Sequence, residues 1–164
     1  MKDEVTVDKP NRAEVDMSGA VEEFFEAYRL EYERADASAI TSYFAFPLQV
    51  ASDTGASGDA MGEIVVMHVA SRDEWTSQID RLLAAYTALG VASARVVESA
   101  MFELSPRLFQ AVLRWELQDS HGDQVYRFDA AYTLARIDGA LRITALAHNE
   151  RPRLQALLAR RSPA

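Results

Sequence analysis

The sequence predicts an α+β fold in which three helices, interleaved with two short strands, precede a long antiparallel meander that curls around them. Three observations indicate this plan. Apolar residues recur at helical spacing in the first half, the period changes to that of strands after Gly90, and short turn sequences separate four runs of strand length. With 164 residues, the chain is long enough for one domain with a buried core.

The first two helices are predicted from apolar stripes. One stripe, on a helix of about four turns, consists of Val21, Phe24, Phe25, Tyr28, Tyr32 and Ala35. Asp36 can cap a second short helix that contains Ile40, Tyr43 and Phe44, and we expect Pro47 to end it. Residues 1–17 have no sustained period, so we expect a flexible arm before a domain over residues 18–150.

The third helix has clear signals at both ends. Short strands are expected at residues 47–52 and 63–70, and the stretch SRDE from Ser71 to Glu74 then reads as a capping box. The helix that it opens carries Trp75 on its apolar face and ends at Gly90.

Four strands are predicted after this helix, at residues 92–104, 108–118, 124–136 and 140–149. The turn sequences between them are SPR, SHGD and DG, and Asp138-Gly139 is the strongest hairpin signal in the chain. Pro152 suits the first turn of a short C-terminal helix within residues 151–164.

Composition argues against several classes of function. The formal net charge of −8 disfavours nucleic-acid binding, which needs clustered Lys and Arg. No apolar run is long enough to span a membrane and the acidic start is not a signal peptide, so we expect no membrane partner and a cytoplasmic location. The absence of cysteine excludes disulfides, thiolate metal ligands and a cysteine nucleophile.

Two stretches carry a resemblance to a known family. They are VEEFFEAYRLEYERADASAITSYFA near the start and YRFDAAYTLARIDGALRITALAHNE near the end. With the order of elements, they resemble the nuclear transport factor 2-like superfamily, which includes SnoaL-like cyclases and ketosteroid isomerases, as well as members without an assigned activity. The resemblance covers about residues 20–150 and implies a cone-shaped, curved antiparallel sheet around three helices, the cystatin-like α+β barrel.

The resemblance also implies site positions. Ketosteroid isomerases place an oxyanion-hole tyrosine eight residues before the turn aspartate, which corresponds to Tyr28. Their general base corresponds to Ser52, with Asp53 one position later, and a shift of one residue on a strand reverses its face. Their second aspartate corresponds to Thr133. This chain therefore has the residue type of the ketosteroid isomerases at one of the three positions, Tyr28.

Strand pairing follows from the turns. If Asp138-Gly139 forms a two-residue loop, the register puts Asp129 directly across from His148 and Arg127 across from Glu150. An aspartate can fix the tautomer of a histidine that moves protons, so Asp129 and His148 are candidate catalytic residues.

Further pairs extend this register. A turn at His121-Gly122 puts Arg114 across from Asp129, as polar support, and Glu116 across from Arg127. A three-residue SPR turn adds Glu98 beside Arg114. Two interpretations stay open. Periodicity puts these charges on the solvated face, whereas the isomerase resemblance puts the face of Thr133 inside the cone.

Two hypotheses of function follow. In the first, the protein binds or converts a small, largely apolar molecule without a cofactor, as an isomerase, cyclase or dehydratase would. Its pocket would be lined by Tyr28, Tyr32, Phe44, Trp75 and Trp115. The alternative is a non-catalytic interaction or assembly domain with a filled core. No histidine pair has metal-ligand spacing, so no metal site is expected, and the resemblance implies a homodimer.

Overall fold

The computed structural model describes residues 12–55 and 62–162. Within them, four helices are present: α1 (Arg12–Glu33), α2 (Ala37–Thr41), α3 (Arg72–Leu89) and α4 (Glu150–Arg161). The strands are β1 (Phe44–Asp53), β2 (Ile64–Val69), β3 (Ser93–Ser105), β4 (Leu108–Gln118), β5 (Gln124–Ile137) and β6 (Ala140–His148).

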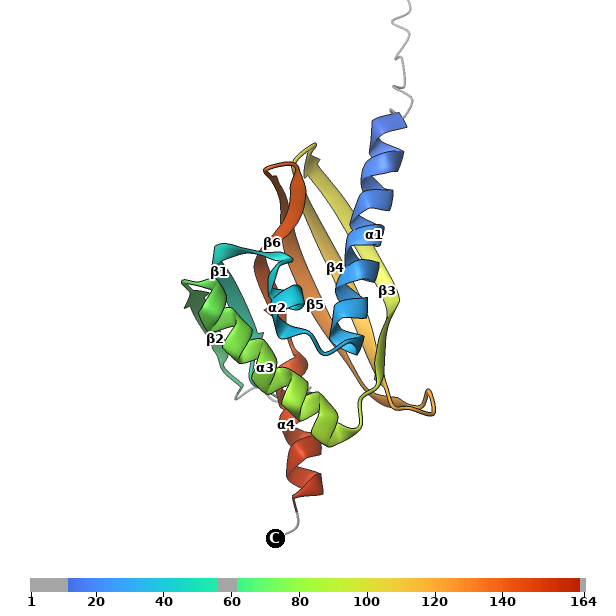
Figure 1. The fold of residues 1–164 in the computed structure, drawn as a ribbon, viewed down its shortest axis with the longest axis vertical. Helices are drawn as coiled ribbons and strands as arrows, with labels where there is room; N and C mark the ends of the chain where they lie inside the picture. Colours follow the sequence, from blue (N-terminus) through green and yellow to red (C-terminus); the bar gives the residue numbers. More distant parts are fainter. Residues whose placement is uncertain (1–11, 56–61, 163–164) are drawn as a thin grey trace, which may run out of the picture.

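The strands form one curved sheet that does not close into a barrel. Its order is β2-β1-β6-β5-β4-β3, so β2 and β3 are its edges. In Figure 1, α1, α2 and α3 lie over one face of this sheet, and α4 lies at its lower end. The predicted α+β plan is confirmed, except that β1 and β6 pair in parallel, so the sheet is not purely antiparallel.

Two predicted boundaries near the start are wrong. Helix α1 already begins at Arg12, so the end of the expected arm is helical, and residues 1–11 of that arm lie outside the described residues. Helix α2 ends at Thr41, well before Pro47. Tyr43 instead accepts a hydrogen bond from Ile143 of β6 through its carbonyl (2.8 Å), because sheet pairing competes successfully with the local helical pattern.

The predicted helix caps are present. The Asp36 side chain accepts a hydrogen bond from the backbone N–H of Ala39 (2.9 Å) at the start of α2. The Ser71 hydroxyl accepts from the N–H of Glu74 at the start of α3. Gly90 ends α3 with φ of +74°, a left-handed conformation that glycine adopts without steric cost.

The predicted hairpin at Asp138-Gly139 forms as a two-residue turn, with Ile137 opposite Ala140. The register then shifts in the middle of β6. Leu134 faces Ile143, but Thr133 faces Ala145, so Thr144 is an extra residue in β6. Such a β-bulge reverses the face to which all later side chains of the strand point.

The two faces of the sheet differ in character. The face under the helices carries the large core residues, among them Leu48, Leu113, Trp115, Tyr132 and Leu134. On the opposite, outer face, the pairings form one row of small and apolar residues across all six strands: Val66, Ala51, Ala147, Ala131, Val112 and Ala100.

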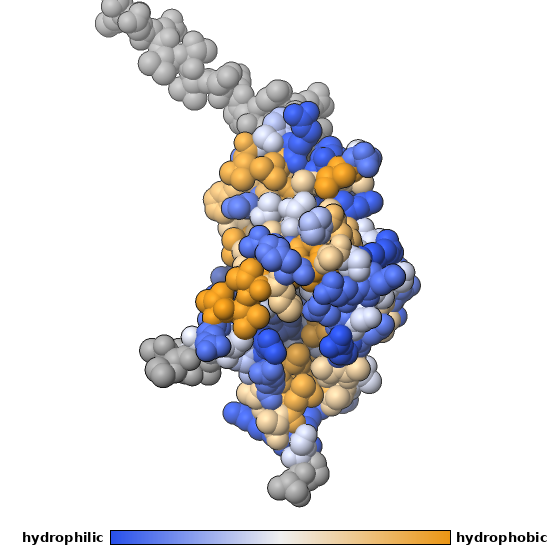
Figure 2. Space-filling view, turned by 90° about the vertical axis from the view of Figure 1, so that its left-hand side faces the viewer, coloured by the Kyte–Doolittle hydropathy of each residue, from blue (hydrophilic) through white to orange (hydrophobic). Residues whose placement is uncertain are grey.

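Apolar side chains also reach the surface at the sheet edges. Figure 2 shows the side of the molecule that includes β1 and β2, where apolar and polar residues are intermixed. On the edge strand β2, Ile64 and Val66 are 66% and 52% exposed. None of the described helices is long and apolar enough to cross a membrane.

Candidate functional site

A cavity of about 650 Å³ lies between the helices and the inner face of the sheet. Helices α1 and α3 supply one wall, strands β1, β4, β5 and β6 supply the other, and the start of α4 lies at one end. Most of its lining is apolar, and seven aromatic residues contribute to it: Tyr28, Tyr32, Trp75, Tyr86, Trp115, Phe128 and Tyr132.

Four of the five side chains predicted to line a pocket lie on this cavity wall: Tyr28, Tyr32, Trp75 and Trp115. Phe44 does not line it. Its ring is buried behind the wall, with centroids 5.3 Å from Trp75 and 6.0 Å from Tyr28. Phe44 therefore supports the position of two lining residues instead of facing the cavity.

A hydrogen bond between Ser52 and His148 joins β1 to β6 at the cavity. The Ser52 hydroxyl oxygen lies 2.9 Å from His148 Nε2, and His148 Nδ1 accepts from the backbone N–H of Glu150 (3.3 Å). A neutral imidazole has one N–H, so Nε2 carries the hydrogen and donates to Ser52. The hydroxyl hydrogen of Ser52 is then free to donate to another group.

Burial keeps His148 neutral. Desolvation and the nearby positive charge of Arg151 both lower the pKa of His148 below its usual value of 6.5. With Nδ1 occupied by a backbone donor, His148 has no lone pair directed at Ser52. It therefore acts as a hydrogen-bond donor and does not activate Ser52 as a nucleophile.

A buried carboxyl group marks the other polar part of the cavity. Glu150 is 7% exposed, and its Oε1 accepts hydrogen bonds from the hydroxyls of Tyr86 (2.5 Å) and Tyr126 (2.7 Å). Burial raises the pKa of Glu150, although the two hydroxyls partly oppose the shift. No hydrogen bond from a described residue reaches its other oxygen, Oε2.

The aromatic wall contains five further polar groups, three tyrosine hydroxyls and two indole N–H groups. The hydroxyls of Tyr28 and Tyr32 are 3.0 Å apart, and Trp115 Nε1 donates to the Tyr132 hydroxyl (2.9 Å). Burial raises the pKa of each of these tyrosines, so all are neutral phenols at physiological pH. Trp75 Nε1 is the one buried side-chain polar atom among the described residues without a hydrogen-bond partner.

The predicted pair of Asp129 and His148 does not form. The bulge at Thr144 puts His148 across from Ala130, so His148 faces the cavity while Asp129 lies on the outer face. There Asp129 accepts from Arg114 Nε (2.8 Å), and this contact holds the pKa of Asp129 below its usual range. The expected acid/base pair is therefore divided between the two faces of the sheet.

The other charged residues predicted to pair across strands lie on the outer face, with the exception of Glu150. Arg114 also binds Glu98 (2.8 Å), which lies opposite it as predicted. The predicted three-residue turn is wrong, because Ser105 pairs with Leu108 and a register shift at Leu104 produces the same pairing. Glu116 faces Arg127 as expected, but Glu150 does not, because it begins α4 and turns into the cavity.

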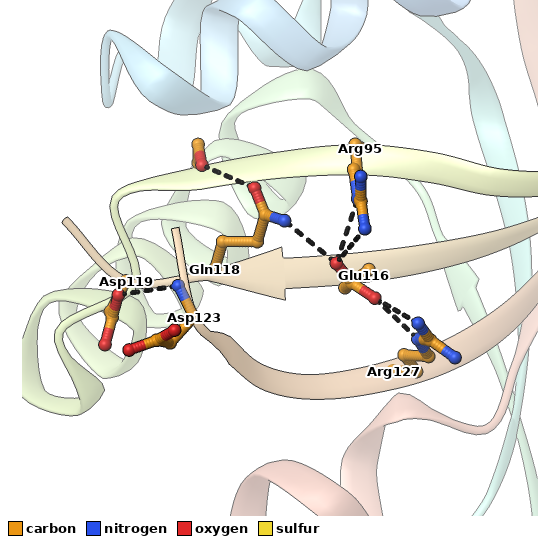
Figure 3. Close-up of polar contacts among 7 residues, drawn as sticks. Arg95, Glu116, Gln118, Asp119, Asp123 and Arg127 are labelled. Atoms are coloured by element: carbon orange, nitrogen blue, oxygen red, sulfur yellow. Dashed lines mark hydrogen bonds and ion pairs between the residues drawn. The ribbon is translucent and has the colours of Figure 1, made fainter. Parts of the chain in front are cut away.

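Glu116 is held between two arginines from neighbouring strands. Figure 3 shows Arg95 of β3 and Arg127 of β5 converging on its carboxylate, and Gln118 also donates to it (2.8 Å). Glu116 is only 2% exposed because these side chains cover it, and the contact with Arg127 is the main cause of its lowered pKa. This cluster joins three strands and lies away from the cavity.

Comparison with known proteins agrees with this geometry. The sequence profile of the family described as NTF2-like protein (DUF6841) matches residues 14–151. The chain belongs to this family. No curated protein matches the chain.

Solved structures of other proteins share the fold, and two of them are described as NTF2-like. One of unknown function from Shewanella oneidensis MR-1 has 16% identity and a TM-score of 0.60, over 80% of this chain and 98% of that one. One with a cystatin-like fold from Novosphingobium aromaticivorans has 14% identity and a TM-score of 0.61, over 93% and 98%. The protein Aln2 from a Streptomyces species has 12% identity and a TM-score of 0.62, over 94% and 100%.

The positions taken from ketosteroid isomerases can be located in this NTF2-like chain. Tyr28 and Ser52 both line the cavity, whereas Asp53 is exposed, as the alternation of a strand requires. Thr133 lies on the outer face, and its neighbour Tyr132 takes the cavity-facing position. The match of Thr133 to an inward-facing residue is therefore wrong by one position.

Sequence reasoning missed Glu150 as a cavity group, and it missed the two tyrosines that donate hydrogen bonds to it. A glutamate beside Pro152 at a strand end is typical of a solvated helix start, so its burial had no local signal. The bulge in β6, in contrast, did have a signal in the sequence. Apolar residues of β6 switch from odd positions, Leu141 and Ile143, to the even position Leu146.

The described residues offer no group of three or more His, Asp or Glu side chains able to hold a metal ion. The polar groups of the cavity are instead arranged for hydrogen bonding: a donor chain at Ser52 and His148, and a carboxyl group at Glu150.

Proposed function

We propose that this NTF2-like protein binds a small, largely apolar molecule in the cavity between its helices and its sheet. The observation that carries the proposal is the cavity of about 650 Å³, which has aromatic walls and two buried polar residues, Ser52 and Glu150, in its lining. Ligand sites typically have volumes of about 300–1,000 Å³ and combine apolar walls with a few polar groups that fix orientation.

The donors on the wall support a ligand with at least one polar atom. The Ser52 hydroxyl and the unpaired Trp75 N–H are both hydrogen-bond donors that no described residue uses up. An acceptor atom on the ligand would accept from the Ser52 hydroxyl, since the Trp75 N–H has almost no accessible surface.

Acid/base chemistry in this cavity would depend on Glu150. A cofactor-independent isomerase, cyclase or dehydratase needs a group that exchanges protons with its substrate. His148 is occupied at both ring nitrogens and Asp129 faces away, which leaves the buried Glu150 carboxyl as the candidate.

The alternative hypothesis is an interaction or assembly domain, whose interior would be filled by its own aromatic residues. The open cavity favours binding over that alternative.

A pair of alanine substitutions tests the proposal. Ala130 is buried on the cavity wall, and Ala84 is exposed on α3. We expect the neutral fluorescent probe N-phenyl-1-naphthylamine to bind the wild-type protein with one saturable site. Ala130→Phe should weaken binding by at least about 10-fold by filling the cavity, whereas Ala84→Phe should not. Unchanged binding in a folded Ala130→Phe variant would contradict the proposal, as would the absence of saturable binding.

We also propose that two copies associate through the outer face of the sheet. The support is the row of small residues across six strands, which includes the exposed Ala131 and Ala147 and lets a second sheet approach closely. Sedimentation should find a dimer that Ala131→Asp converts to a monomer, and a monomeric wild-type protein would overturn this proposal.

A further inference from the structure

Within the part of the chain that the structure describes, Glu150 is a buried acid without a positive partner. Its two hydrogen-bond donors, the hydroxyls of Tyr86 and Tyr126, are neutral. Among residues 12–55 and 62–162, no Arg, Lys or His lies within ion-pair distance of its carboxyl group. The other buried acid, Glu116, has two arginines. Glu150 therefore differs from the other buried acid in lacking compensation.

Burying a carboxylate without a counter-charge is unfavourable, and a protein can respond in two ways. The group can take up a proton, or a positive charge can be supplied by a ligand. The surroundings of Glu150 suit the second response, because the cavity that it lines is rich in aromatic rings. The faces of such rings attract cations, and a site that combines rings with a carboxylate recognises ammonium groups.

We propose that the polar group of the ligand is a cation, a protonated amine or quaternary ammonium, which docks on Glu150 inside the aromatic cavity. The inference rests on the proposed function, because it assigns the chemistry of the molecule that the cavity takes. The free Oε2 atom accepts a hydrogen bond from a protonated amine, or attracts a quaternary ammonium by charge alone, while Tyr86 and Tyr126 hold Oε1 in place. The apolar remainder of the ligand packs on the aromatic wall.

The other charged groups of the cavity are compatible with a cation. Arg29 is neutralised by Glu26 and Glu33. Arg81 and Arg151 are exposed, so water and salt weaken their effect on Glu150, although Arg151 still acts on the nearby His148. The titratable groups that surround Glu150 are Tyr28 and Tyr32 of α1, Tyr86 of α3, Tyr126 and Tyr132 of β5, His148 of β6 and Arg151 of α4. Of these, only Arg151 is positively charged at neutral pH.

Two probes of matched shape test the inference: 4-phenylbutylamine, which is a cation at neutral pH, and the neutral 4-phenylbutan-1-ol. By titration calorimetry, the wild-type protein should bind the amine at least about 10-fold more tightly than the alcohol. Glu150→Gln keeps the size of the side chain and an oxygen for the two tyrosines, and should remove this preference. Glu103→Gln changes an exposed acid on β3 that does not line the cavity and should leave the preference intact.

The outcomes separate this inference from the proposed function. Equal affinity for the two probes, or a preference that survives in Glu150→Gln, would overturn the cation assignment and leave the cavity as a binding site. Binding of neither probe, together with no binding of N-phenyl-1-naphthylamine, would overturn both.

A second measurement on the wild-type protein does not depend on any variant folding. Because burial raises the pKa of Glu150, cation binding should release a proton from the carboxyl group at slightly acidic pH. Calorimetry in two buffers of different ionisation enthalpy detects this release. Amine binding that releases no proton at any pH at which the free protein holds the Glu150 proton would contradict a docked cation at Glu150.

Discussion

His148 Nε2 lies 2.9 Å from the hydroxyl oxygen of Ser52, a contact between residues 96 positions apart in the chain. This hydrogen bond connects β1 to β6 on the inner face of the sheet and fixes the tautomer of the imidazole. Ser52 is buried and His148 is partly buried, so the bond contributes to stability as well as to the polarity of the cavity.

Ser52→Ala should destabilise the protein by about 1–2 kcal/mol, because it leaves the Nε2–H of His148 without its acceptor. Chemical denaturation measures this loss, with the exposed Ser77→Ala on α3 as the matched control. Nitrogen chemical shifts of the imidazole should report the Nε2–H tautomer in the wild-type protein. A predominant Nδ1–H tautomer would show that the hydrogen bond to the Glu150 N–H is assigned incorrectly.

The stability of the folded protein should fall as the pH is lowered, because His148 is partly buried in its neutral form. Its pKa is lowered in the folded state, so its contribution is present above the usual value of 6.5 and is lost as pH falls through the lowered value. Melting temperatures between about pH 8 and pH 5 should therefore decline less steeply in His148→Gln than in the wild-type protein. His68→Gln, an exposed change on β2, should keep the wild-type slope. Equal slopes in all three proteins would contradict a buried, neutral imidazole.

The two tryptophans should differ in their response to phenylalanine. Both are buried, but Trp115 Nε1 donates to the Tyr132 hydroxyl, whereas Trp75 Nε1 has no described partner. Trp115→Phe should therefore cost about 1 kcal/mol more than Trp75→Phe in free energy of unfolding. The same loss in both variants would mean that the Trp75 indole already has an acceptor, such as a bound water.

Glu116 should matter more for stability than the other acids on the outer face. It receives hydrogen bonds from Arg95, Arg127 and Gln118, whereas Glu98 has a single, exposed ion pair with Arg114. Glu116→Gln should lower the urea midpoint more than Glu98→Gln does, and added salt should reduce the effect of Glu98→Gln further. A larger effect from Glu98→Gln would mean that the arginine cluster contributes little.

Deletion of Thr144 should cost little stability. Thr144 is the extra residue of the bulge, so without it Ala145 follows Ile143 directly, opposite Thr133, and Leu146 and His148 keep their inward direction. We expect a loss of about 1 kcal/mol in free energy of unfolding by chemical denaturation, similar to that of Thr144→Ala, because both variants remove the hydrogen bond to the Thr133 carbonyl. A loss of about 3 kcal/mol or more from the deletion alone would show that β6 needs the bend of the bulge.

The sequence was most informative where local chemistry decides the structure. Asp36, Ser71 and Gly90 act at helix ends, and Asp138-Gly139 sets a hairpin register that holds as far as Ile143. Each of these features depends only on a few neighbouring residues, so it can be predicted from the local sequence.

The candidate site was harder to predict because its causes are not local. The face of His148 depends on a bulge four residues earlier, and the parallel pairing of β1 with β6 brings Ser52 to it. Glu150 becomes a cavity group only because Tyr86 and Tyr126 reach it from two other elements. A charge pattern alone therefore predicted the outer face well and the cavity poorly.

The parallel pairing of β1 with β6 has a consequence for how the chain is synthesised. Strands β3, β4 and β5 can form consecutive hairpins as they leave the ribosome, but β1 and β2 have no partner among them. Until residues 140–148 emerge, the nascent protein holds two separate pieces of sheet whose inner edges, β1 and β5, are unpaired. Unpaired strand edges can pair with the wrong strands, so the nascent chain is most prone to aggregation before β6 is in place. When β6 pairs with β1 and β5, it joins the two pieces of sheet and covers both edges.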